Sequence, residues 1–499
     1  MDFIIQQAVG SDIKVLLELK DQVRLHTYKE FIPDLKWEDI KYNETYDARA
    51  QKIMSQIQEK KVFIFCAKDN SQNILGYIKI IHRGSIVEIQ DLFIIPTAQG
   101  MGIGSQLMIK AWDLFKDQDS VWQLKVNVLE NNTKAIEFYK KHGFAPDMGR
   151  IFYYKIGDNK KANTIKMYKL NEKTTSQFLQ SARLILNNFV ENNIPIIEVD
   201  PLSNSYIVSV NSNYIYSRGI LTPLNTLSAS HLANDKLTSK KILQFFRIPT
   251  PDYLCFRKKE NTDIKEIRLK LEEFLQKHSR IIAKPQNGLK SKDVFLNIQN
   301  VNQALEAYNH IINKEYKGVL FESFAEGDVH RLLLVDGTLI AALRREKGYI
   351  IADGISTLNQ LITQKNQYLD HGGRNVGRIR IDEKLNAVLK DQGFDSLEDV
   401  PAKDTKVFTE IDFSNLETVT EVTDIVSPAL TQKLSGLANK IGLGLTGIDV
   451  ISTDISDEGK CSIIEINKEP SIDFHHYPDY GEAKDVAGEI VRAIIRKYS

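Results

Sequence analysis

Three glycines lie within five positions in the stretch IIPTAQGMGIGSQLM, at Gly100, Gly102 and Gly104. Glycine is needed where a side chain would block close approach or where the backbone takes a positive φ angle. Apolar residues precede this stretch and a helix-like run follows it, so the glycines lie at the expected beginning of a helix. Free amide groups at such an end bind anions. The stretch therefore predicts a site for a ligand that contains phosphate.

A second group of chemically suited residues lies near the C-terminus, in LTGIDVISTDISDEGKCSIIEIN. Two strand-like runs flank an acidic turn, and a hairpin centred on Asp457 would place Asp449 opposite Glu465. Asn467 would share their face because side chains alternate along a strand. Two carboxylates and an amide oxygen suit Mg²⁺ held between protein and nucleotide phosphates. The hairpin therefore predicts a magnesium site.

Two lysines upstream of this hairpin are placed where they could neutralise phosphate charge. Lys284 lies at the end of the apolar strand-like run IIAKP, and Lys236 lies at the start of the helix-like run DKLTSKKIL. Together with the acidic hairpin, the two lysines predict a nucleotide site.

The composition limits the class of protein. The chain has 499 residues, 42% of them hydrophobic, and 65 Lys and Arg against 65 Asp and Glu. This length allows two to four domains, and zero formal charge gives no support for nucleic-acid binding. The three cysteines show no metal-ligand spacing, and no signal peptide or membrane span is visible. We therefore expect a cytoplasmic protein that binds neither nucleic acid nor membrane.

The elements that must position these residues alternate between short strands and helices along the whole chain. Residues 1–170 contain the strand-like runs VFIFCAKD, ILGYIKIIHRG and IVEIQDLFII and the helix-like runs SQLMIKAWDLFK and NTKAIEFYKKHG. Residues 171–230 form a less regular connecting region, and residues 231–499 contain a second series of strands and helices. The pattern predicts the α/β (α+β) fold class, with two unlike catalytic modules.

The first module resembles the GNAT acetyltransferases. The order strand, Gln99-x-x-Gly102-x-Gly104, helix is similar to motif A of that family, and NNTKAIEFYKKHGF matches its later N-x-x-A-x-x-x-Y-x-x-x-G-F motif. The resemblance implies a GNAT fold with a central mixed sheet, in which loop amides hold the pyrophosphate of acetyl-CoA. By position, the implied cofactor-binding residues are Ile94, Ile95, Gln99, Gly100, Met101, Gly102, Ile103, Gly104, Ser105 and Asn132.

The chemistry of that family requires a neutral amine, so a base must remove a proton from it. Glu88 and Asp91 precede the glycine loop, and their odd spacing predicts that they lie on opposite faces of the strand. Either of them could be the base, with Glu88 our first candidate. Tyr139 matches the family tyrosine that can donate a proton to the leaving thiolate.

The second module resembles the ATP-grasp superfamily, most closely the branch of cyanophycin synthetase and the ATP-grasp part of bifunctional glutathione synthetases. The run ESFAEGDVHR follows that branch's E-x-x-x-x-G-x-x-x-R pattern, and the likeness extends from about residue 231 to the C-terminus. The resemblance implies two α+β subdomains that bind ATP and Mg²⁺. The roles that it implies are phosphate contacts for Lys236 and Lys284, an adenine hinge for Glu322, Ser323, Phe324 and Ala325, contact with the transferred phosphoryl group for Arg331, and metal binding for Asp449, Glu465 and Asn467.

Three features depart from the ATP-grasp pattern. The loop QNGLKSKDV after Lys284 retains only one glycine, Gly288, and adds Lys290 and Lys292. The stretch SNLETVTEVTD lacks a glycine pair, and Val329 occupies the position of an acidic ribose contact, beside Asp328. These departures predict an altered phosphate lid or acceptor pocket.

A GNAT module followed by this kind of ATP-grasp module resembles the N-acetylglutaminylglutamine synthetase family. That resemblance implies a bifunctional enzyme that uses acetyl-CoA, ATP and Mg²⁺ to acetylate an amino acid and to form an amide bond through an acyl phosphate. We expect small amino-acid or dipeptide substrates, and a homo-oligomer is possible. The alternative is a different amide ligase of the glutathione or cyanophycin synthetase type, whose GNAT domain senses acyl-CoA.

Overall fold

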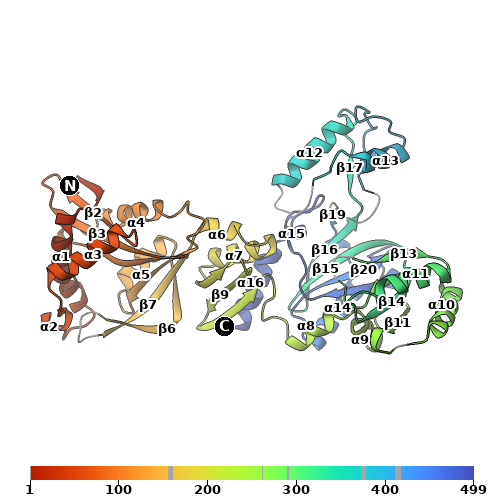
Figure 1. The fold of residues 1–499 in the computed structure, drawn as a ribbon, viewed down its shortest axis with the longest axis horizontal. Helices are drawn as coiled ribbons and strands as arrows, with labels where there is room; N and C mark the ends of the chain where they lie inside the picture. The colour runs from red at the N-terminus through yellow and green to blue at the C-terminus, as the bar shows by residue number, and fades with distance from the viewer. Residues whose placement is uncertain (1, 156–160, 261, 289–291, 372–377, 411–416) are drawn as a thin grey trace. The chain divides into compact units, whose positions relative to one another are not determined.

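The computed structural model describes residues 2–155, 161–260, 262–288, 292–371, 378–410 and 417–499. The chain divides into two compact units, unit 1 with Met1–Gly219 and Ile495–Ser499, and unit 2 with Ile220–Ile494. The division falls within the predicted connecting region 171–230. Both units combine helices with sheets, which confirms the α/β fold class (Figure 1).

Unit 1 is built on a seven-stranded sheet with the strand order β1-β2-β3-β4-β5-β7-β6. The central pair β4 and β5 is parallel and the other neighbours are antiparallel, so the sheet is mixed, as predicted. Its strands are β1 (Phe3–Gln7), β2 (Val62–Asp69), β3 (Ile74–Arg83), β4 (Ile86–Ile94), β5 (Gln123–Leu129), β6 (Ala145–Lys155) and β7 (Lys161–Leu170).

Helices cover both faces of this sheet and bury two apolar layers. One layer joins the sheet to α1 (Gly10–Lys29) and α3 (Tyr46–Gln58), and the other joins it to α4 (Ile103–Asp113) and α5 (Thr133–Lys141). The short helix α2 (Trp37–Ile40) follows α1. Burial of these apolar side chains supplies the main driving force for packing.

The parallel strands β4 and β5 pair only over Ile86–Ile89 and Gln123–Val126. Beyond Ile89, β4 continues to Ile94 paired with β3 alone. The sheet is therefore open along the last residues of β4, and groups from both faces can approach each other there.

The rest of unit 1 consists of α6 (Glu172–Ser176), α7 (Gln180–Glu191) and a three-stranded sheet of order β10-β9-β8. Its strands are β8 (Ile196–Asp200), β9 (Ser205–Val210) and β10 (Asn213–Arg218). The last residues of the chain join this unit, where Asn211 Nδ2 donates a hydrogen bond to Ser499 Oγ at 3.3 Å.

Unit 2 contains two main antiparallel sheets, each with its own apolar core. The first, of order β11-β14-β12-β13, packs against α10 (Ile264–His278) and α11 (Val301–Ile312). Its strands are β11 (Tyr253–Arg257), β12 (Ile281–Pro285), β13 (Phe295–Ile298) and β14 (Gly318–Ser323).

The second main sheet, of order β19-β16-β15-β20-β21, packs against α8 (Leu227–Ala233), α9 (Lys236–Phe245) and α14 (Pro428–Ile441). Its strands are β15 (Asp328–Val335), β16 (Thr338–Glu346), β19 (Thr418–Glu421), β20 (Leu445–Ser452) and β21 (Cys461–Asn467). The other elements of unit 2 are β17 (Tyr349–Ile351), α12 (Leu358–His371), α13 (Glu383–Asp391), β18 (Lys406–Phe408), α15 (Asp473–His476) and α16 (Val486–Lys497), whose residues from Ile495 onward count with unit 1.

Within the described parts of the chain, no helix combines the length and the apolar composition that a bilayer crossing requires.

Candidate functional sites

The glycine loop of unit 1 leads from β4 into α4. Gly100 and Gly102 both have a φ of +80°, a backbone conformation that L side chains rarely adopt. Gly102 is the N-cap of α4 and gives it no side-chain cap, so no side chain competes for the first amides of the helix. A Cβ on either glycine would meet no protein atom within 4 Å. The loop therefore presents open backbone amides, as an anion site requires.

Several neighbours of the loop already have hydrogen-bond partners. Gln99 Nε2 donates to the Ile94 carbonyl oxygen at 3.2 Å, and Ser105 Oγ lies 3.1 Å from His142 Nε2. Asn132 Oδ1 accepts from the Ala135 amide at 3.0 Å and caps α5. These contacts hold the side chains of Gln99, Ser105 and Asn132 in place, and cofactor binding by these residues stays a prediction.

The prediction that Glu88 and Asp91 lie on opposite faces of their strand is wrong. Lys79 pairs with Asp91 while Ile81 pairs with Glu88, and a register shift falls between them because Gln90 is an extra residue in β4. The extra residue of a bulge shifts the alternation of side chains by one position, so two residues at an odd spacing can point to the same face of the sheet. Glu88 and Asp91 therefore share the face that packs against α1.

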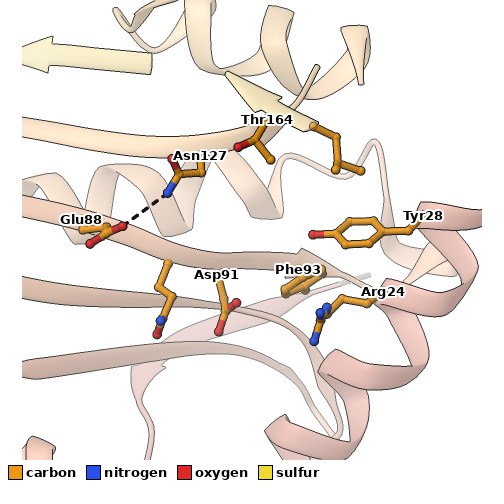
Figure 2. A pocket seen from close by; sticks show the side chains of 9 residues that line it. Arg24, Tyr28, Glu88, Asp91, Phe93, Asn127 and Thr164 are labelled. Carbon is orange, nitrogen blue, oxygen red and sulfur yellow. Dashed lines mark hydrogen bonds between the residues drawn. The ribbon is translucent and has the colours of Figure 1, made fainter. Parts of the chain in front are cut away.

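Both carboxylates line one cavity of about 60 Å³ in unit 1. Figure 2 shows Glu88 and Asp91 on β4, Arg24 and Tyr28 on α1, and Asn127 of β5 and Thr164 of β7 around it. The remaining lining residues are Gln90, Phe93 and Leu129. The cavity adjoins the open end of the β4–β5 pair, and we take it as the candidate amine site.

The two carboxylates differ in their charge partners. Asp91 is buried and lies 2.7 Å from Lys20 Nζ. Burial alone would raise its pKa, but Lys20 and Lys79 outweigh that effect and hold the pKa of Asp91 below its usual value. Glu88 accepts hydrogen bonds from Arg83 Nε at 3.1 Å and Asn127 Nδ2 at 3.4 Å. The pairing of Asp91 with Lys20 weakens it as a base, and the role of Glu88 as the base stays a prediction.

Tyr139 of α5 lies in the apolar layer that joins the sheet to α4 and α5. It is buried against Phe138 and Phe144, and its hydroxyl makes no hydrogen bond among the described residues. Burial raises the pKa of Tyr139 well above its usual value, and the nearby Tyr28 and Asp91 raise it further by smaller amounts. The phenol therefore keeps its proton over the physiological pH range, as a general acid requires.

The acidic hairpin of unit 2 has the predicted pairing. Asp449 on β20 pairs with Glu465 on β21, and Gly447 pairs with Asn467, so both carboxylates and the amide share a face. The register shifts by one residue nearer the turn, and the pairing there is not centred on Asp457. On the other side of β20, Arg331 of β15 pairs with Asp449. Arg331, Asp449 and Glu465 therefore form a row across three adjacent strands.

Each carboxylate in this row has a cationic partner. Arg331 donates to both oxygens of Asp449, with Nη2 at 2.9 Å from Oδ2, and Lys236 Nζ lies 2.5 Å from Glu465 Oε1. Arg345 on β16 lies 3.9 Å from Asp449 Oδ2. These contacts bring Arg331, Lys236 and the predicted metal ligands together, as the sequence indicated.

The row has donor atoms of the kind that Mg²⁺ binds. Asp449, Glu465 and Asn467 supply carboxylate and amide oxygens on one face, and Asn467 Nδ2 lies 3.4 Å from Asp449 Oδ2. Groups of three or more His, Cys, Asp and Glu placed to hold a metal do not occur among the described residues. The predicted site has two carboxylates, so nucleotide phosphates would complete the coordination.

Lys284 lies in a second charged cluster, which includes a lysine that the sequence reasoning missed. Glu322 is buried and its two oxygens lie 2.8 Å from Lys284 Nζ and 3.1 Å from Lys240 Nζ. Burial lowers the pKa of Lys240 to about 8. Because two lysines share one carboxylate, the cluster has an excess of positive charge that an anion could balance. The only sequence signal for Lys240 was its position one helical turn after Lys236.

The predicted hinge Glu322–Ala325 begins at the end of β14. The side chain of Glu322 turns into the lysine cluster, and the Ser323 amide donates to the Asp252 carbonyl oxygen at 2.9 Å. The Phe324 ring lies under the Arg280 guanidinium, 3.4 Å from ring centroid to Cζ. Ala325 follows in a loop, and the adenine contact stays a prediction.

The predicted phosphate lid lies partly outside the described residues. Lys290 falls in the undescribed range 289–291, whereas Lys292 is described and exposed. Of the glycine-poor stretch 414–424, residues 414–416 are also outside the described residues. Asp328 is exposed at the start of β15, and Val329 pairs with Arg345 on β16.

Comparisons with known proteins agree with both resemblances. Residues 27–144 match the family model described as the acetyltransferase (GNAT) family. The chain is 29% identical over 272 residues to cyanophycin synthetase of Synechocystis, covering 52% of this chain and 30% of that protein. It is 28% identical over 302 residues to the glutathione biosynthesis bifunctional protein GshAB of Streptococcus mutans, covering 57% of this chain and 38% of that protein. The chain thus spans about a third of these curated relatives.

Among solved structures, a bifunctional glutathione synthetase from Pasteurella multocida superposes with a TM-score of 0.53 at 18% identity, over 65% of this chain and 45% of that chain. This likeness shows a shared fold. The chain therefore combines a region that matches the GNAT family model with a region similar to cyanophycin synthetase and to bifunctional glutathione synthetases, which agrees with the predicted fusion.

Replacement of Tyr139 by Phe tests its role as general acid. The ring and its packing are retained, so we expect acetyl transfer to fall by ~10²-fold or more while acetyl-CoA binding is unchanged. The measurement is the rate of free thiol release. Tyr153→Phe, at an exposed tyrosine of β6, is the matched control, and equal rates in the two variants would leave Tyr139 as a packing residue.

Glu465→Gln tests the row of charges in unit 2. The change removes one ligand charge with little change of shape, so we expect ATP-dependent ligation to fall by ~10²-fold or more. Acetyl transfer should continue at its normal rate in the same protein. ADP release and thiol release measure the two activities, and Glu482→Gln, at an exposed position, is the control. Normal ADP formation coupled to amide product in Glu465→Gln would remove this carboxylate from the proposed site.

Proposed function

We propose that the chain is a bifunctional enzyme that transfers an acetyl group from acetyl-CoA to an amine and joins a carboxylate to an amine at the expense of ATP. The observation that supports the ligase most is the row formed by Arg331, Asp449 and Glu465 across β15, β20 and β21, with Lys236 on Glu465. The uncapped glycine loop supports the transferase.

In the proposed acetyl transfer, the nitrogen of a neutral amine attacks the thioester carbonyl carbon. A C–N bond forms and the C–S bond breaks, so the products are an acetylated amine and free CoA. Glu88 on the cavity wall accepts the proton that the amine loses. Tyr139 donates its proton to the thiolate.

In the proposed ligation, a substrate carboxylate oxygen attacks the terminal phosphorus of ATP, so that a P–O bond forms, the bond to ADP breaks and an acyl phosphate results. The nitrogen of an amine then attacks the carbonyl carbon, a C–N bond forms, and the C–O bond to the phosphate group breaks, which releases phosphate. Lys236 and Lys284 lie where they can contact the phosphates, and Arg331 can contact the moving phosphoryl group. Asp449, Glu465 and Asn467 would hold Mg²⁺, which when bound neutralises phosphate charge.

The proposed acetyl transfer and the proposed ligation could act in turn to make a single product. Acetylation blocks one amine, so an amide ligase can extend the molecule only at another group. We propose that the product is a small acetylated amide of the kind made by N-acetylglutaminylglutamine synthetase, which combines the same two modules in the same order. Acetyl-CoA, ATP, Mg²⁺ and all twenty amino acids, with products identified by mass, form the direct test of this assignment.

Gly102→Asp tests whether the two activities use separate sites. A carboxylate at the start of α4 would repel the CoA pyrophosphate and strain a backbone at positive φ. We expect acetyl transfer to be lost while ligation of a pre-acetylated substrate persists. Gly84→Asp, at another positive-φ glycine with open space around it, controls for the strain.

Loss of both activities in folded Gly102→Asp protein would contradict the assignment of separate sites. Acetyl-CoA binding by the natural protein without thiol release to any amine would instead favour the alternative, an amide ligase whose GNAT domain senses acyl-CoA.

A further inference from the structure

The proposed metal and Arg331 compete for the same carboxylate in unit 2. Arg331 donates to both oxygens of Asp449. A Mg²⁺ ion held by Asp449 would bind these oxygens and would also repel the guanidinium beside it. Because the side chain of Arg331 is largely buried, the loss of its carboxylate partner would leave an uncompensated charge, which is costly. Arg331 therefore needs another acceptor once the metal is bound.

The chain after β21 crosses the face of the sheet that carries Arg331. A Cβ on Gly447 would lie 2.7 Å from Pro470 Cβ and 3.0 Å from Arg331 Cδ, so both side chains meet over this glycine. Further along, α15 packs against β16, the neighbour of β15 in the sheet. A Cβ on Gly481 would lie 2.7 Å from the Cβ of Glu421, which the strand pairing places on the same face as Arg331. Residues 468–481 therefore cover part of the face that holds the proposed ligase residues.

His475 of α15 lies in this covering segment and is fully buried. Neither of its ring nitrogens has a hydrogen-bond partner among the described residues. Burial first, and then the charges of Arg331 and His476, lower the pKa of His475 to about 3. The imidazole is therefore neutral at physiological pH and keeps one nitrogen as an acceptor. A buried acceptor without a partner is costly, so a donor that reached this nitrogen would be favoured.

Arg331 is the donor best suited to this acceptor. A guanidinium carries five N–H donors and no acceptor, so it complements the free nitrogen of a neutral imidazole. The charge of Arg331 also acts more strongly on the ring of His475 than that of His476 does. His476 is engaged elsewhere, because its Nε2 atom accepts from the Ala487 amide at 3.0 Å. The segment that covers Arg331 thus carries the acceptor that Arg331 would need.

We infer that His475 is a positioning residue for Arg331, whose hydrogen bond passes from Asp449 to the imidazole when Mg²⁺ binds between Asp449 and the nucleotide. This inference rests on the proposed ligase function. Without the metal, Arg331 neutralises Asp449. With the metal, one N–H group of Arg331 is donated to His475, and the remaining N–H groups are available to the phosphoryl group. The exchange frees the carboxylate for the metal and keeps the guanidinium hydrogen-bonded.

The first test measures the binding of ADP to the full-length protein, without turnover, in Mg²⁺ and in excess EDTA. In His475→Phe we expect the Kd for ADP in Mg²⁺ to rise by ~10-fold or more, the usual scale for a lost hydrogen bond to a charged group. The Kd in EDTA should be unchanged, because Arg331 then stays on Asp449. His475→Gln keeps an acceptor and should restore most of the affinity in Mg²⁺. His231→Phe, at an exposed histidine of α8, is the control.

The second test asks whether the effect passes through Arg331. In Arg331→Gln the carboxylate of Asp449 is already free, so the further change His475→Phe should alter the Kd for ADP in Mg²⁺ by less than ~2-fold. A further loss of ~10-fold in the double variant would overturn the inference, since His475 would then act without Arg331.

The failures of the inference and of the ligase function have different signatures. A natural protein that binds no ADP in Mg²⁺ would overturn the ligase site and the inference with it. An equal rise of the Kd in Mg²⁺ and in EDTA, or no rise at all, in folded His475→Phe would overturn the inference alone, because it would leave His475 with a structural role.

If His475→Phe does not fold, the ring ¹⁵N signal of His475 in the natural protein decides, assigned by its absence from His475→Gln. We expect this signal to move when Mg²⁺ is added to the ADP complex and not with ADP alone, because only the metal sends Arg331 to the imidazole. A signal that the metal leaves in place would overturn the inference.

Discussion

A buried ionised side chain must have a partner of opposite charge, and this constraint organises both units. Asp91 lies against Lys20 in unit 1, and Asp449 lies against Arg331 in unit 2. Removal of one member of such a pair leaves an uncompensated buried charge, which costs about 3–5 kcal/mol. The pairs therefore join α1 to β4 and β15 to β20, and the loss of either partner would destabilise its unit.

The same constraint explains how charged ligands could enter sites that are already neutralised. Lys236 is bound to Glu465, and Lys284 is bound to Glu322. An anionic ligand can approach these lysines only if it replaces a carboxylate as their partner, at least in part. The Lys284–Glu322–Lys240 cluster favours this exchange because it holds one more cation than anion. In the proposed binding of phosphates to unit 2, the ligand would share these lysines with the carboxylates.

The features predicted well from the sequence were those that local pattern determines. Three glycines before a helix indicated the loop, and a hairpin placed about Asp457 was enough to pair Asp449 with Glu465. The position of Asp91 could not be predicted because the bulge at Gln90 depends on how β4 pairs with β3, which leaves no mark on the hydrophobic pattern. Lys240 was missed for a similar reason, since its partner Glu322 lies 82 positions further along the chain and meets it only through the fold.

The placement of residues 495–499 in unit 1 affects the order in which the chain can fold. Residues 2–219 leave the ribosome first, but the last five residues of the unit follow only after all of unit 2 has been made. At ordinary synthesis rates that delay is on the order of tens of seconds. During that time Asn211 Nδ2 cannot donate its hydrogen bond to Ser499 Oγ. Unit 2 is in effect an insertion within unit 1, so the unit that begins folding first is the last to be completed.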